Sequence, residues 1–347
     1  MRAARLYSYD PDVTGPEFVK IEQVPEPEIS EPDDVIVRVG GAGVCRTDLH
    51  IVQGLWDSAM VVDPPYILGH ENAGWVVEVG SSVRGIGEDD PVVILPGLAD
   101  GTCDACRGGF DNRCENLVWQ GIQLDGGFAE YLRTKDRNLI RLPDGLEPKA
   151  AAPYADAGLT AYRAAKRAAV DLPPGSTAVV MGVGGLGHVG VQALKALTAA
   201  RIIAIDASPE ALTLASELGA DDTLEAGPEV VDEVLQLAEG RGAEAVLDFY
   251  AEENVPAQGL AMTKVGGQYM VIGYGGMVTV PAMDLMATEK RIVGSVGGTY
   301  LELKELLALY EKGEVNIRYQ EYPFEQVNQV LDDLNQNRIR GRAVLVL

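Results

Sequence analysis

The sequence has few positively charged residues and no long apolar stretch. Of its 347 residues, 28 are lysine or arginine and 52 are aspartate or glutamate, so the formal net charge is −24. A surface that binds nucleic acid needs clustered cations, and this balance argues against one. No run of about 18 apolar residues occurs, so we expect no membrane-spanning helix. Residues 1–10 lack the apolar core of a secretory signal, so we expect a cytoplasmic protein.

Lysine is scarce even among the basic residues, at nine of the 28. An acidic, lysine-poor surface stays hydrated where salt screens the repulsion between its charges. We therefore predict a protein of a high-salt cytosol. The simpler alternative is an ordinary solvated acidic surface.

Cysteine is also rare, with four residues: Cys45, Cys103, Cys106 and Cys114. They could form two disulfides in three pairings. Because we expect no export signal, reduced thiols that bind metal are favoured over disulfides. The remaining composition, 47% hydrophobic and 6% aromatic, is typical of a globular protein, and the length suffices for two domains.

The first part of the chain has the pattern of a β-rich domain. From Arg2 to about Asp156, short apolar runs alternate with glycines and prolines, and residues 35–39, 75–79 and 91–95 are expected to be buried strands. We expect the loops between such strands to carry Cys45 and His70.

A histidine and a glutamate stand side by side in GHENAG, residues 69–74, downstream of Cys45 in GVCRTDLH, residues 43–50. Thiolate and imidazole are ligand types that zinc prefers. A catalytic zinc usually takes three protein ligands and leaves a fourth position open. The motif therefore indicates a catalytic metal site that needs one more ligand.

A second metal site is indicated by DGTCDAC, residues 100–106, followed by Cys114. Two cysteines three residues apart can hold one ion from a tight turn, and Cys114 closes the loop back on them. A tetrahedral structural zinc needs a fourth ligand. Asp100, three residues before Cys103, is our candidate. The other carboxylates considered are Asp104 and Glu115.

From Ala157 the pattern changes to alternating strands and helices. An apolar strand at Thr177–Met181 leads into GVGGLG, residues 182–187, then into a helix from His188 to about Ala199 and a strand that ends at Asp206. The G-x-G-x-x-G pattern thus lies between a strand and a helix, with an acid about 20 residues further on. This context is typical of dinucleotide binding.

Each glycine of this motif has a physical role. Gly182 permits the tight turn, Gly184 lets the backbone approach a pyrophosphate, and Gly187 lets the helix pack on the strand. Asp206 would accept hydrogen bonds from the adenosine ribose and repel a 2′-phosphate. No basic residue follows it closely. We therefore expect NAD as coenzyme instead of NADP, although Asp206 could simply face solvent.

The alternation continues along the chain and predicts a parallel sheet with helices on both faces. The final segment is expected to leave this domain and return to the first. Expected helices span residues 208–218, 229–238, 301–310 and 324–334, and expected strands 245–249, 268–273 and 343–347.

Together these motifs resemble the zinc-containing alcohol dehydrogenases of the medium-chain dehydrogenase/reductase family, over essentially the whole length. Residues 69–83, with the pattern G-H-E-x-x-G-x5-G-x-x-V, match the specific signature of that family. Residues 43–50 match its first zinc-ligand loop. The cysteine lobe and the glycine-rich turn match its structural-zinc lobe and its coenzyme site.

The resemblance implies an α/β fold of two domains. A GroES-like β-rich catalytic domain would comprise residues 1–156 and 298–347, with the structural-zinc lobe at about 97–116. Residues 157–297 would form a Rossmann coenzyme domain with a doubly wound parallel sheet. A homodimer or homotetramer, joined through the coenzyme domains, is also implied.

The resemblance assigns the metal ligands by position. Cys45 and His70 would bind catalytic zinc, with Glu71 beside the metal as an alternate or outer ligand and Asp48 orienting the imidazole. Asp156 stands where the family usually has a third zinc cysteine, and Asp100 where the lobe usually has its first. Carboxylate is an accepted zinc ligand, but it donates less electron density than thiolate. The zinc would then be a stronger Lewis acid and more weakly held.

The other implied roles concern proton transfer, coenzyme and substrate. Thr47 would accept the hydroxyl proton of the substrate and pass it through the nicotinamide ribose to His50. Trp119 would form a wall of the substrate pocket. The implied coenzyme contacts are Arg46, Thr160, Gly182, Gly184, Gly185, Leu186, Gly187, Asp206 and Arg342.

The sequence therefore predicts a zinc-dependent oxidoreductase that interconverts alcohols and aldehydes or ketones by hydride transfer to and from NAD. An acid at position 156 also occurs in polyol dehydrogenases of this family, so a polyol or sugar dehydrogenase is the first alternative. A nucleotide-binding homologue without catalysis, or a metal-free quinone or enone reductase, would have no need of this ligand set.

Overall fold

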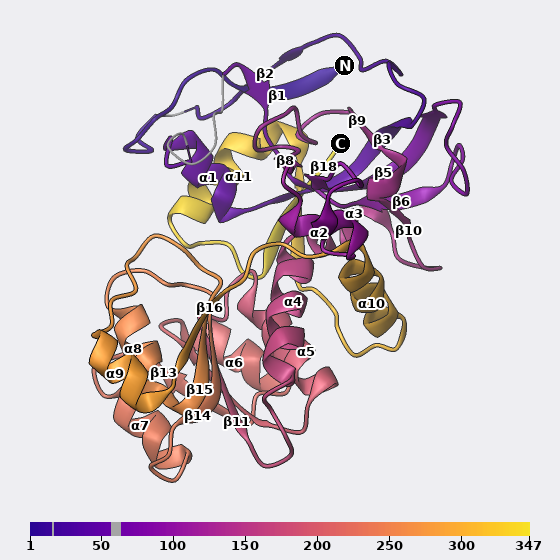
Figure 1. Ribbon diagram of the computed structural model, residues 1–347. Coiled ribbons are helices and arrows are strands. Elements are labelled where there is room, and N and C mark those ends of the chain that lie inside the picture. Colours follow the sequence, from indigo (N-terminus) through magenta and orange to yellow (C-terminus); the bar gives the residue numbers. More distant parts are fainter. Residues whose placement is uncertain (16, 57–63) are drawn as a thin grey trace. The chain divides into compact units, whose positions relative to one another are not determined.

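The computed structural model describes residues 1–15, 17–56 and 64–347, which divide into two compact units (Figure 1). Unit 1 is Met1–Ala157, Gly298–Ala308 and Ile317–Leu347. Unit 2 is Gly158–Gly297 and Leu309–Asn316. Within the described ranges, no helix combines the length and the apolar character that crossing a membrane would require.

Most of unit 1 is β-structure. In the part of the chain that is described, its largest sheet has the strand order β10-β6-β5-β3-β18-β17, and β9 also pairs with β3. The central strand β3 is almost entirely buried and pairs with β5, β9 and β18. The strands are β3 (Asp34–Val44), β5 (Glu71–Val79), β6 (Pro91–Ile94), β9 (Tyr131–Lys135), β10 (Leu139–Arg141), β17 (Tyr319–Pro323) and β18 (Arg342–Val346).

Two smaller sheets and several short helices complete unit 1. One sheet has the order β2-β1-β4 and the other pairs β7 with β8. These strands are β1 (Arg2–Leu6), β2 (Lys20–Gln23), β4 (Tyr66–Ile67), β7 (Gly97–Leu98) and β8 (Val118–Trp119). The helices are α1 (Arg46–Val52), α2 (Asp104–Arg107), α3 (Pro148–Ala151) and α11 (Val327–Asn335), with 3₁₀ turns η1 (Asp111–Arg113), η2 (Asp136–Asn138), η3 (Ala152–Tyr154) and η4 (Phe324–Gln326).

The end of the chain returns to unit 1, as the sequence predicted. Strand β18 runs antiparallel to β3, with Ala343 opposite Val44, and α11 packs against α1 (Figure 1). One segment differs from the expected boundaries. We expected all of residues 298–347 to join the first domain, but Leu309–Asn316 belongs to unit 2 and the boundary falls within α10 (Tyr300–Glu311). The side chain of Gln192 holds this segment, because it bonds both the N–H and the carbonyl of Asn316.

Unit 2 is built on a parallel sheet with the order β13-β12-β11-β14-β15-β16. Figure 1 shows α5 and α6 together on one side of this sheet and α7 and α8 on the other. The strands are β11 (Thr177–Met181), β12 (Arg201–Asp206), β13 (Asp222–Glu225), β14 (Ala243–Asp248), β15 (Thr263–Val271) and β16 (Arg291–Gly294). The helices are α4 (Ala157–Ala169), α5 (Gly187–Leu197), α6 (Pro209–Glu217), α7 (Val230–Leu237), α8 (Val255–Met262) and α9 (Ala282–Thr288).

The strand order of unit 2 reverses between β11 and β14. In doubly wound sheets, ligands bind outside the carboxyl ends of the strands at such a switch point. Strand β11 ends at Met181, directly before the glycine-rich turn, and β14 ends at Asp248, which stands opposite Met181 in the register. The predicted α/β fold class is therefore confirmed, and the predicted dinucleotide motif lies at the position where such folds bind ligands.

Candidate active site

Four predicted metal ligands meet in unit 1: Cys45, His70, Glu71 and Asp156. One ligand atom of each lies within 4.8 Å of those of the others. Asp156 Oδ2 lies 3.8 Å from Cys45 Sγ and 3.5 Å from His70 Nε2. Ligands that are about 2.0–2.3 Å from a tetrahedral zinc are separated by roughly 3.3–3.8 Å. These two distances match the edges of such a tetrahedron.

The N-terminus of α1 holds two of these groups in place. Cys45 follows β3 and precedes α1, and its backbone N–H donates to Asp48 Oδ2 at 2.8 Å. The other oxygen of Asp48 lies 3.2 Å from Nδ1 of His70. Asp48 therefore connects the backbone at Cys45 with the imidazole, which is the orienting role that the resemblance predicted for it.

The cluster is buried and favours positive charge. His70 is 2% exposed and Asp48 is fully buried. Burial lowers the pKa of His70, but the carboxylates of Asp48 and Asp156 outweigh burial and hold this pKa well above its usual range. A site that raises the pKa of a buried imidazole in this way also stabilises a bound cation.

Glu71 is the most enclosed member of the cluster. Its Oε1 accepts hydrogen bonds from the backbone N–H of Ala157 and from Nη2 of Arg342. Its Oε2 is buried and has no hydrogen-bond partner among the described residues. A Cβ atom at Gly43 would lie 2.1 Å from this oxygen, so only glycine leaves room for the carboxylate. Glu71 opens β5 opposite Gly43, so this strand begins four residues before the strand that we expected at residues 75–79.

This donor set fits zinc. A thiol, an imidazole and two carboxylates converge in a buried site, and one carboxylate oxygen there has no donor from the described protein. Buried carboxylate oxygens without a partner are costly, and a metal ion is one of the few groups that satisfies them. The residues present are therefore those that a zinc ion would need.

The structure gives Arg342 a contact that the resemblance did not imply. We expected its guanidinium to contact the coenzyme pyrophosphate. Its side chain is 4% exposed, and Nη2 lies 2.5 Å from Glu71 Oε1. Burial lowers the pKa of Arg342, but the negative charges of Glu71 and Cys45 outweigh burial and raise this pKa above its usual value. The guanidinium therefore stays charged. Sequence analysis missed this ion pair because its partners are 271 residues apart and no local pattern joins them.

The predicted proton-transfer residues lie on α1, directly after Cys45. Thr47 and His50 are three residues apart on this helix and therefore lie on the same face. Arg46 begins α1, and its Nη1 bonds Oδ1 of Asn337 at 3.2 Å. One short helix thus carries a metal ligand at its N-cap and both proposed proton-transfer side chains in its first turns.

Lowering the pH should destabilise the protein partly through His50. Burial, and secondly the charge of Arg46, lower the pKa of His50 to about 4. An unfolded histidine has a pKa of about 6.5, so the stabilisation is complete above pH 6.5 and is lost as the pH falls toward 4. Between pH 7 and pH 5, this group should lower the free energy of unfolding by roughly 1 kcal/mol, allowing for its partial exposure. Denaturant unfolding of His50→Gln should show a smaller loss than wild type, and an equal loss would contradict the prediction.

The second predicted metal site also assembles. Ligand atoms of Asp100, Cys103, Cys106 and Cys114 all lie within 4.8 Å of one another, and no disulfide joins these cysteines. The backbone N–H of Asp100 donates to Cys114 Sγ at 3.3 Å. Backbone N–H groups of Cys106 and Glu115 lower the pKa of Cys103, which favours its thiolate. The lobe therefore presents three thiols and one carboxylate to a common centre, and Asp104 and Glu115 are not part of that group.

Asp100 also shapes the loop of this lobe. Its Oδ1 accepts from the backbone N–H groups of Thr102 and Cys103, and its Oδ2 accepts from the side chain of Asn116. These donors hold the pKa of Asp100 far below its usual range. The carboxylate is therefore ionised and fixed in orientation, as a metal ligand would need to be.

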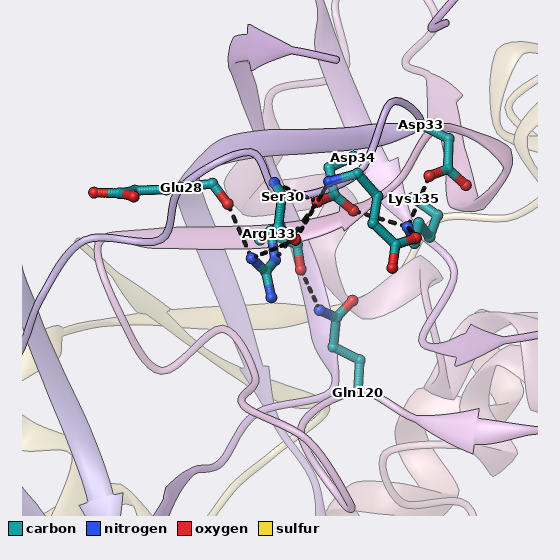
Figure 2. Close-up of polar contacts among 8 residues, drawn as sticks. Glu28, Ser30, Asp33, Asp34, Gln120, Arg133 and Lys135 are labelled. Atoms are coloured by element: carbon teal, nitrogen blue, oxygen red, sulfur yellow. Dashed lines mark hydrogen bonds and ion pairs between the residues drawn. The ribbon is translucent and has the colours of Figure 1, made fainter. Parts of the chain in front are cut away.

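A third group of neighbouring carboxylates consists of Glu31, Asp33 and Asp34. Figure 2 shows Asp33 and Asp34 beside Lys135. The ammonium group of Lys135, on β9, lies 2.7–2.9 Å from one oxygen of each. Burial alone would raise the pKa of Asp34, but Lys135 and backbone donors outweigh it and hold the pKa well below its usual range. Lys135 offsets part of the negative charge of this cluster and ties the segment before β3 to β9.

In unit 2, the glycine-rich turn has the conformation that the motif predicted. Gly182 has φ 81°, in the left-handed region. A Cβ at Gly187 would lie 1.9 Å from the carbonyl oxygen of Gly182, so the helix can start this close to the strand only with glycine. Space is open at Gly184, where no atom lies within 4 Å of an added Cβ. Leu186 is the N-cap of α5, and Gly185 lies within the turn.

Asp206 stands at the end of β12 and faces this turn. Its Oδ2 accepts from the backbone N–H of Val183 at 2.7 Å, and its Oδ1 from that of Ser208 at 2.8 Å. The carboxylate thus lies beside the glycine-rich turn and not out in solvent. Thr160, the other predicted coenzyme contact in unit 2, is a buried residue of α4.

Trp119, the predicted wall of the substrate pocket, lies in unit 1. It forms part of β8, opposite Gly97 of β7, and is half-buried against the hydrophobic core. A role for Trp119 as a wall of the substrate pocket remains a prediction.

The chain is similar to known proteins over nearly its whole length. Residues 31–144 match the alcohol dehydrogenase GroES-like domain, and residues 185–312 match the zinc-binding dehydrogenase family. An NAD-dependent alcohol dehydrogenase of Sulfolobus acidocaldarius is 34% identical over 335 residues, which cover 95% of this chain and 96% of that protein. A D-arabinose 1-dehydrogenase (NADP(+)) of Saccharolobus solfataricus is 34% identical over 333 residues, with 95% and 94% covered.

A solved structure gives the same result for the fold. The crystal structure of the alcohol dehydrogenase from the hyperthermophilic archaeon Aeropyrum pernix superposes with a TM-score of 0.95 at 42% sequence identity, and each chain is covered completely. The family models, the full-length similarity and the shared fold lead to one conclusion. This chain belongs to the zinc-containing alcohol dehydrogenases of the medium-chain dehydrogenase/reductase family.

Proposed function

We propose that this protein oxidises small alcohols to aldehydes or ketones, and reduces such carbonyls in the reverse direction, with NAD and zinc. The observation that carries the proposal is the convergence of Cys45, His70 and Asp156 within 4.8 Å in a buried site that favours a cation. The glycine-rich turn and Asp206 supply the features of a dinucleotide site in unit 2.

Cys45, His70 and Asp156 would hold the catalytic zinc, which supplies Lewis acidity of the kind that lowers the pKa of water from about 15.7 to about 7. Asp48 fixes the imidazole of His70 through Nδ1, so Nε2, which lies 3.5 Å from Asp156 Oδ2, is the nitrogen that would bind the metal. Thr47 takes the proton of the substrate hydroxyl and His50 accepts it further along the same helical face. The lowered pKa of His50 leaves its ring neutral at pH 7 and makes it a weak base, so His50 would pass the proton on instead of holding it.

Glu71 and Arg342 have a joint role in this proposal. The Glu71 carboxylate adds negative charge beside Cys45, His70 and Asp156. Arg342 compensates that charge through its ion pair with Glu71. We propose this charge balance for Arg342, and we keep the pyrophosphate contact as a proposal for both Arg46 and Arg342. Asp100, Cys103, Cys106 and Cys114 would hold the structural zinc.

For the coenzyme, we propose that the amides at Gly184, Gly185 and Leu186 face the pyrophosphate and that Thr160 contacts the nicotinamide. NAD supplies the hydride acceptor. Asp206 would bond the adenosine ribose and repel a 2′-phosphate, so NAD should be preferred over NADP. One relative is named for NADP(+) and another as NAD-dependent, so the preference of this protein for NAD over NADP is tested by measuring rates with each coenzyme.

A polyol or sugar dehydrogenase is the second candidate. Asp156 replaces the usual cysteine, and one relative of 34% identity is named as a D-arabinose dehydrogenase. A carboxylate ligand makes zinc a stronger Lewis acid than a thiolate does, but this alone does not select a substrate.

Initial rates with a substrate panel distinguish the two candidates. We would measure NAD and NADP reduction with simple alcohols, polyols and aldoses, in potassium chloride with trace zinc, before and after chelation. Turnover of primary or secondary alcohols with NAD, lost on chelation, supports the main proposal. Turnover confined to polyols or aldoses would refute the main proposal and support a polyol or sugar dehydrogenase. Chelation-resistant turnover would refute a zinc mechanism.

We further propose that the protein is a homodimer or homotetramer in which β16 of unit 2 pairs with a second copy. This strand forms an edge of the sheet, and Ile292 on it and Val296 after it are exposed. The nearby helix α9 exposes Met283 and Met286 and has no buried residue. Exposed apolar strand edges are templates for pairing. Light scattering should give a mass of two or four times 37.0 kDa. A mass of 37.0 kDa, that of a monomer, would refute this proposal.

We also propose a cytoplasmic location with high salt, because acidic residues outnumber basic ones in this sequence. At a net charge of −24, salt should relieve repulsion between exposed carboxylates. We therefore propose that molar potassium chloride raises the midpoint of thermal unfolding. Equal stability with and without salt would contradict the high-salt proposal.

A further inference from the structure

In unit 2, the loop after β14 packs against the glycine-rich turn. The backbone N–H of Phe249 donates to the carbonyl oxygen of Met181, the last residue of β11, at 2.9 Å. A Cβ atom at Gly182 would lie 3.3 Å from Cβ of Tyr250, and one at Gly190 would lie 2.8 Å from the ring of Phe249. The loop and the turn therefore share a packed boundary at the switch point of the sheet, where a dinucleotide binds in this type of fold.

The carboxylate of Asp248 fixes this loop. Its Oδ1 accepts from the backbone N–H groups of Tyr250 at 3.0 Å and Ala251 at 2.8 Å. Its Oδ2 accepts from the hydroxyl of Tyr269, on β15, at 2.6 Å. Both Asp248 and Tyr269 are fully buried. The carboxylate therefore links a neighbouring strand to two consecutive amides of the loop.

The conformation of the loop requires such a restraint. Ala251 and Glu253 have φ values of 52° and 51°, in the left-handed region that residues with a Cβ rarely adopt. The ring of Tyr269 is itself held by close packing, because a Cβ at Gly259 would lie 2.4 Å from it. A rigid ring thus orients the Asp248 carboxylate, and the carboxylate orients the backbone of the loop.

Tyr250 is the residue of this loop that can reach a ligand. Its side chain is 42% exposed and lies beside Gly182, and its N–H is one of the two amides bonded to Asp248. We propose that Tyr250 contacts the bound coenzyme and that Asp248 and Tyr269 are positioning residues, which set coenzyme affinity through Tyr250. This inference rests on the proposed use of NAD.

The test is the affinity of the zinc-loaded, full-length protein for NADH, measured by fluorescence titration. Tyr269→Phe removes only the hydroxyl and keeps the packed ring. We expect NADH binding to weaken about tenfold, because Oδ2 of Asp248 loses its donor and the loop loses its fixed orientation. The KM for NAD should rise by a similar factor, while kcat and the KM for the alcohol should change less than twofold.

A matched control separates positioning from general destabilisation. Thr263→Val removes another buried hydroxyl from β15, at the opposite end of the strand, where Thr263 bonds the carbonyl of Gly259. This variant should lower the unfolding temperature but leave NADH affinity unchanged. Asp248→Asn, made in the otherwise wild-type protein, keeps an acceptor for the two amides. Its NADH affinity should stay within about threefold of wild type.

A double-mutant cycle tests whether the effect passes through Tyr250. Tyr250→Ala should weaken NADH binding, and Tyr269→Phe added to it should weaken binding no further. Wild-type NADH affinity in Tyr269→Phe, or an equal loss of NADH affinity in Thr263→Val, would overturn this inference but leave the proposed function intact. No NADH binding by the wild-type protein would instead refute the proposed function, and the inference with it.

Discussion

Replacing His70 with alanine should reduce zinc content from about two ions per chain to about one and abolish turnover. The imidazole is one of four side chains whose ligand atoms lie within 4.8 Å of one another, and it is the nitrogen ligand of that cluster. Lewis acidity supplies several kcal/mol of transition-state stabilisation, and each 1.36 kcal/mol is tenfold in rate. We therefore expect kcat/KM to fall by at least about a thousandfold.

A reciprocal variant provides the control for this result. Cys106→Ser removes a thiol of the second cluster, in the lobe of unit 1 that carries no proposed catalytic residue. It should also lose one zinc and lower the unfolding temperature, but keep most of its turnover at moderate temperature. Elemental analysis and initial rates on both variants decide the matter. Full activity with one zinc in His70→Ala would show that the proposed catalytic site is misassigned.

Replacing Arg342 with methionine should lower the free energy of unfolding by about 3–5 kcal/mol. Arg342 and Glu71 form a buried ion pair, with side chains 4% and 0% exposed. Methionine fills the apolar volume but leaves the Glu71 carboxylate without its cation. Burial already raises the pKa of Glu71, and loss of Arg342 removes the group that most opposes this. Denaturant unfolding measures the change.

Two comparisons make the result specific. Arg338→Met removes an arginine that pairs at the surface of the same unit with Asp332 and Asp333, and it should cost less than about 1 kcal/mol. Loading with zinc should reduce the loss in Arg342→Met, because the metal ion would supply positive charge beside Glu71. An equally small loss in both arginine variants would refute the role that we assign to the buried pair.

Much of the site could be predicted from local sequence because the chemistry restricts the choice of residues. Zinc accepts few side-chain types, and close spacing in the lobe of residues 100–114 lets neighbouring ligands reach one ion. The glycine-rich turn is local for a similar reason, since a short strand, a tight turn and a helix start are consecutive in the chain. These predictions concern contacts between residues that are near in sequence or fixed by a motif.

The contacts that sequence analysis missed join distant segments. Glu71 and Arg342 meet because β5 and β18 both pair with β3, and nothing in either segment alone indicates the other. The resemblance even assigned Arg342 to the coenzyme. In the same way, Asp248 and Tyr269 come together because β14 and β15 are neighbours in the sheet of unit 2. Strand pairing, which depends on the whole hydrophobic pattern, selects these partners.

The sequence by itself determined the family, the two-unit α/β architecture, and the candidate ligand types of both proposed metal sites. It could do so because the relevant signals are short, and because thiolate, imidazole and glycine each have few substitutes. Only the tertiary structure decided which charges face each other in the buried interior. Burial in a medium of low polarity makes each unpaired charge costly, so Glu71 takes Arg342 and Asp248 takes Tyr269 as partners across strands.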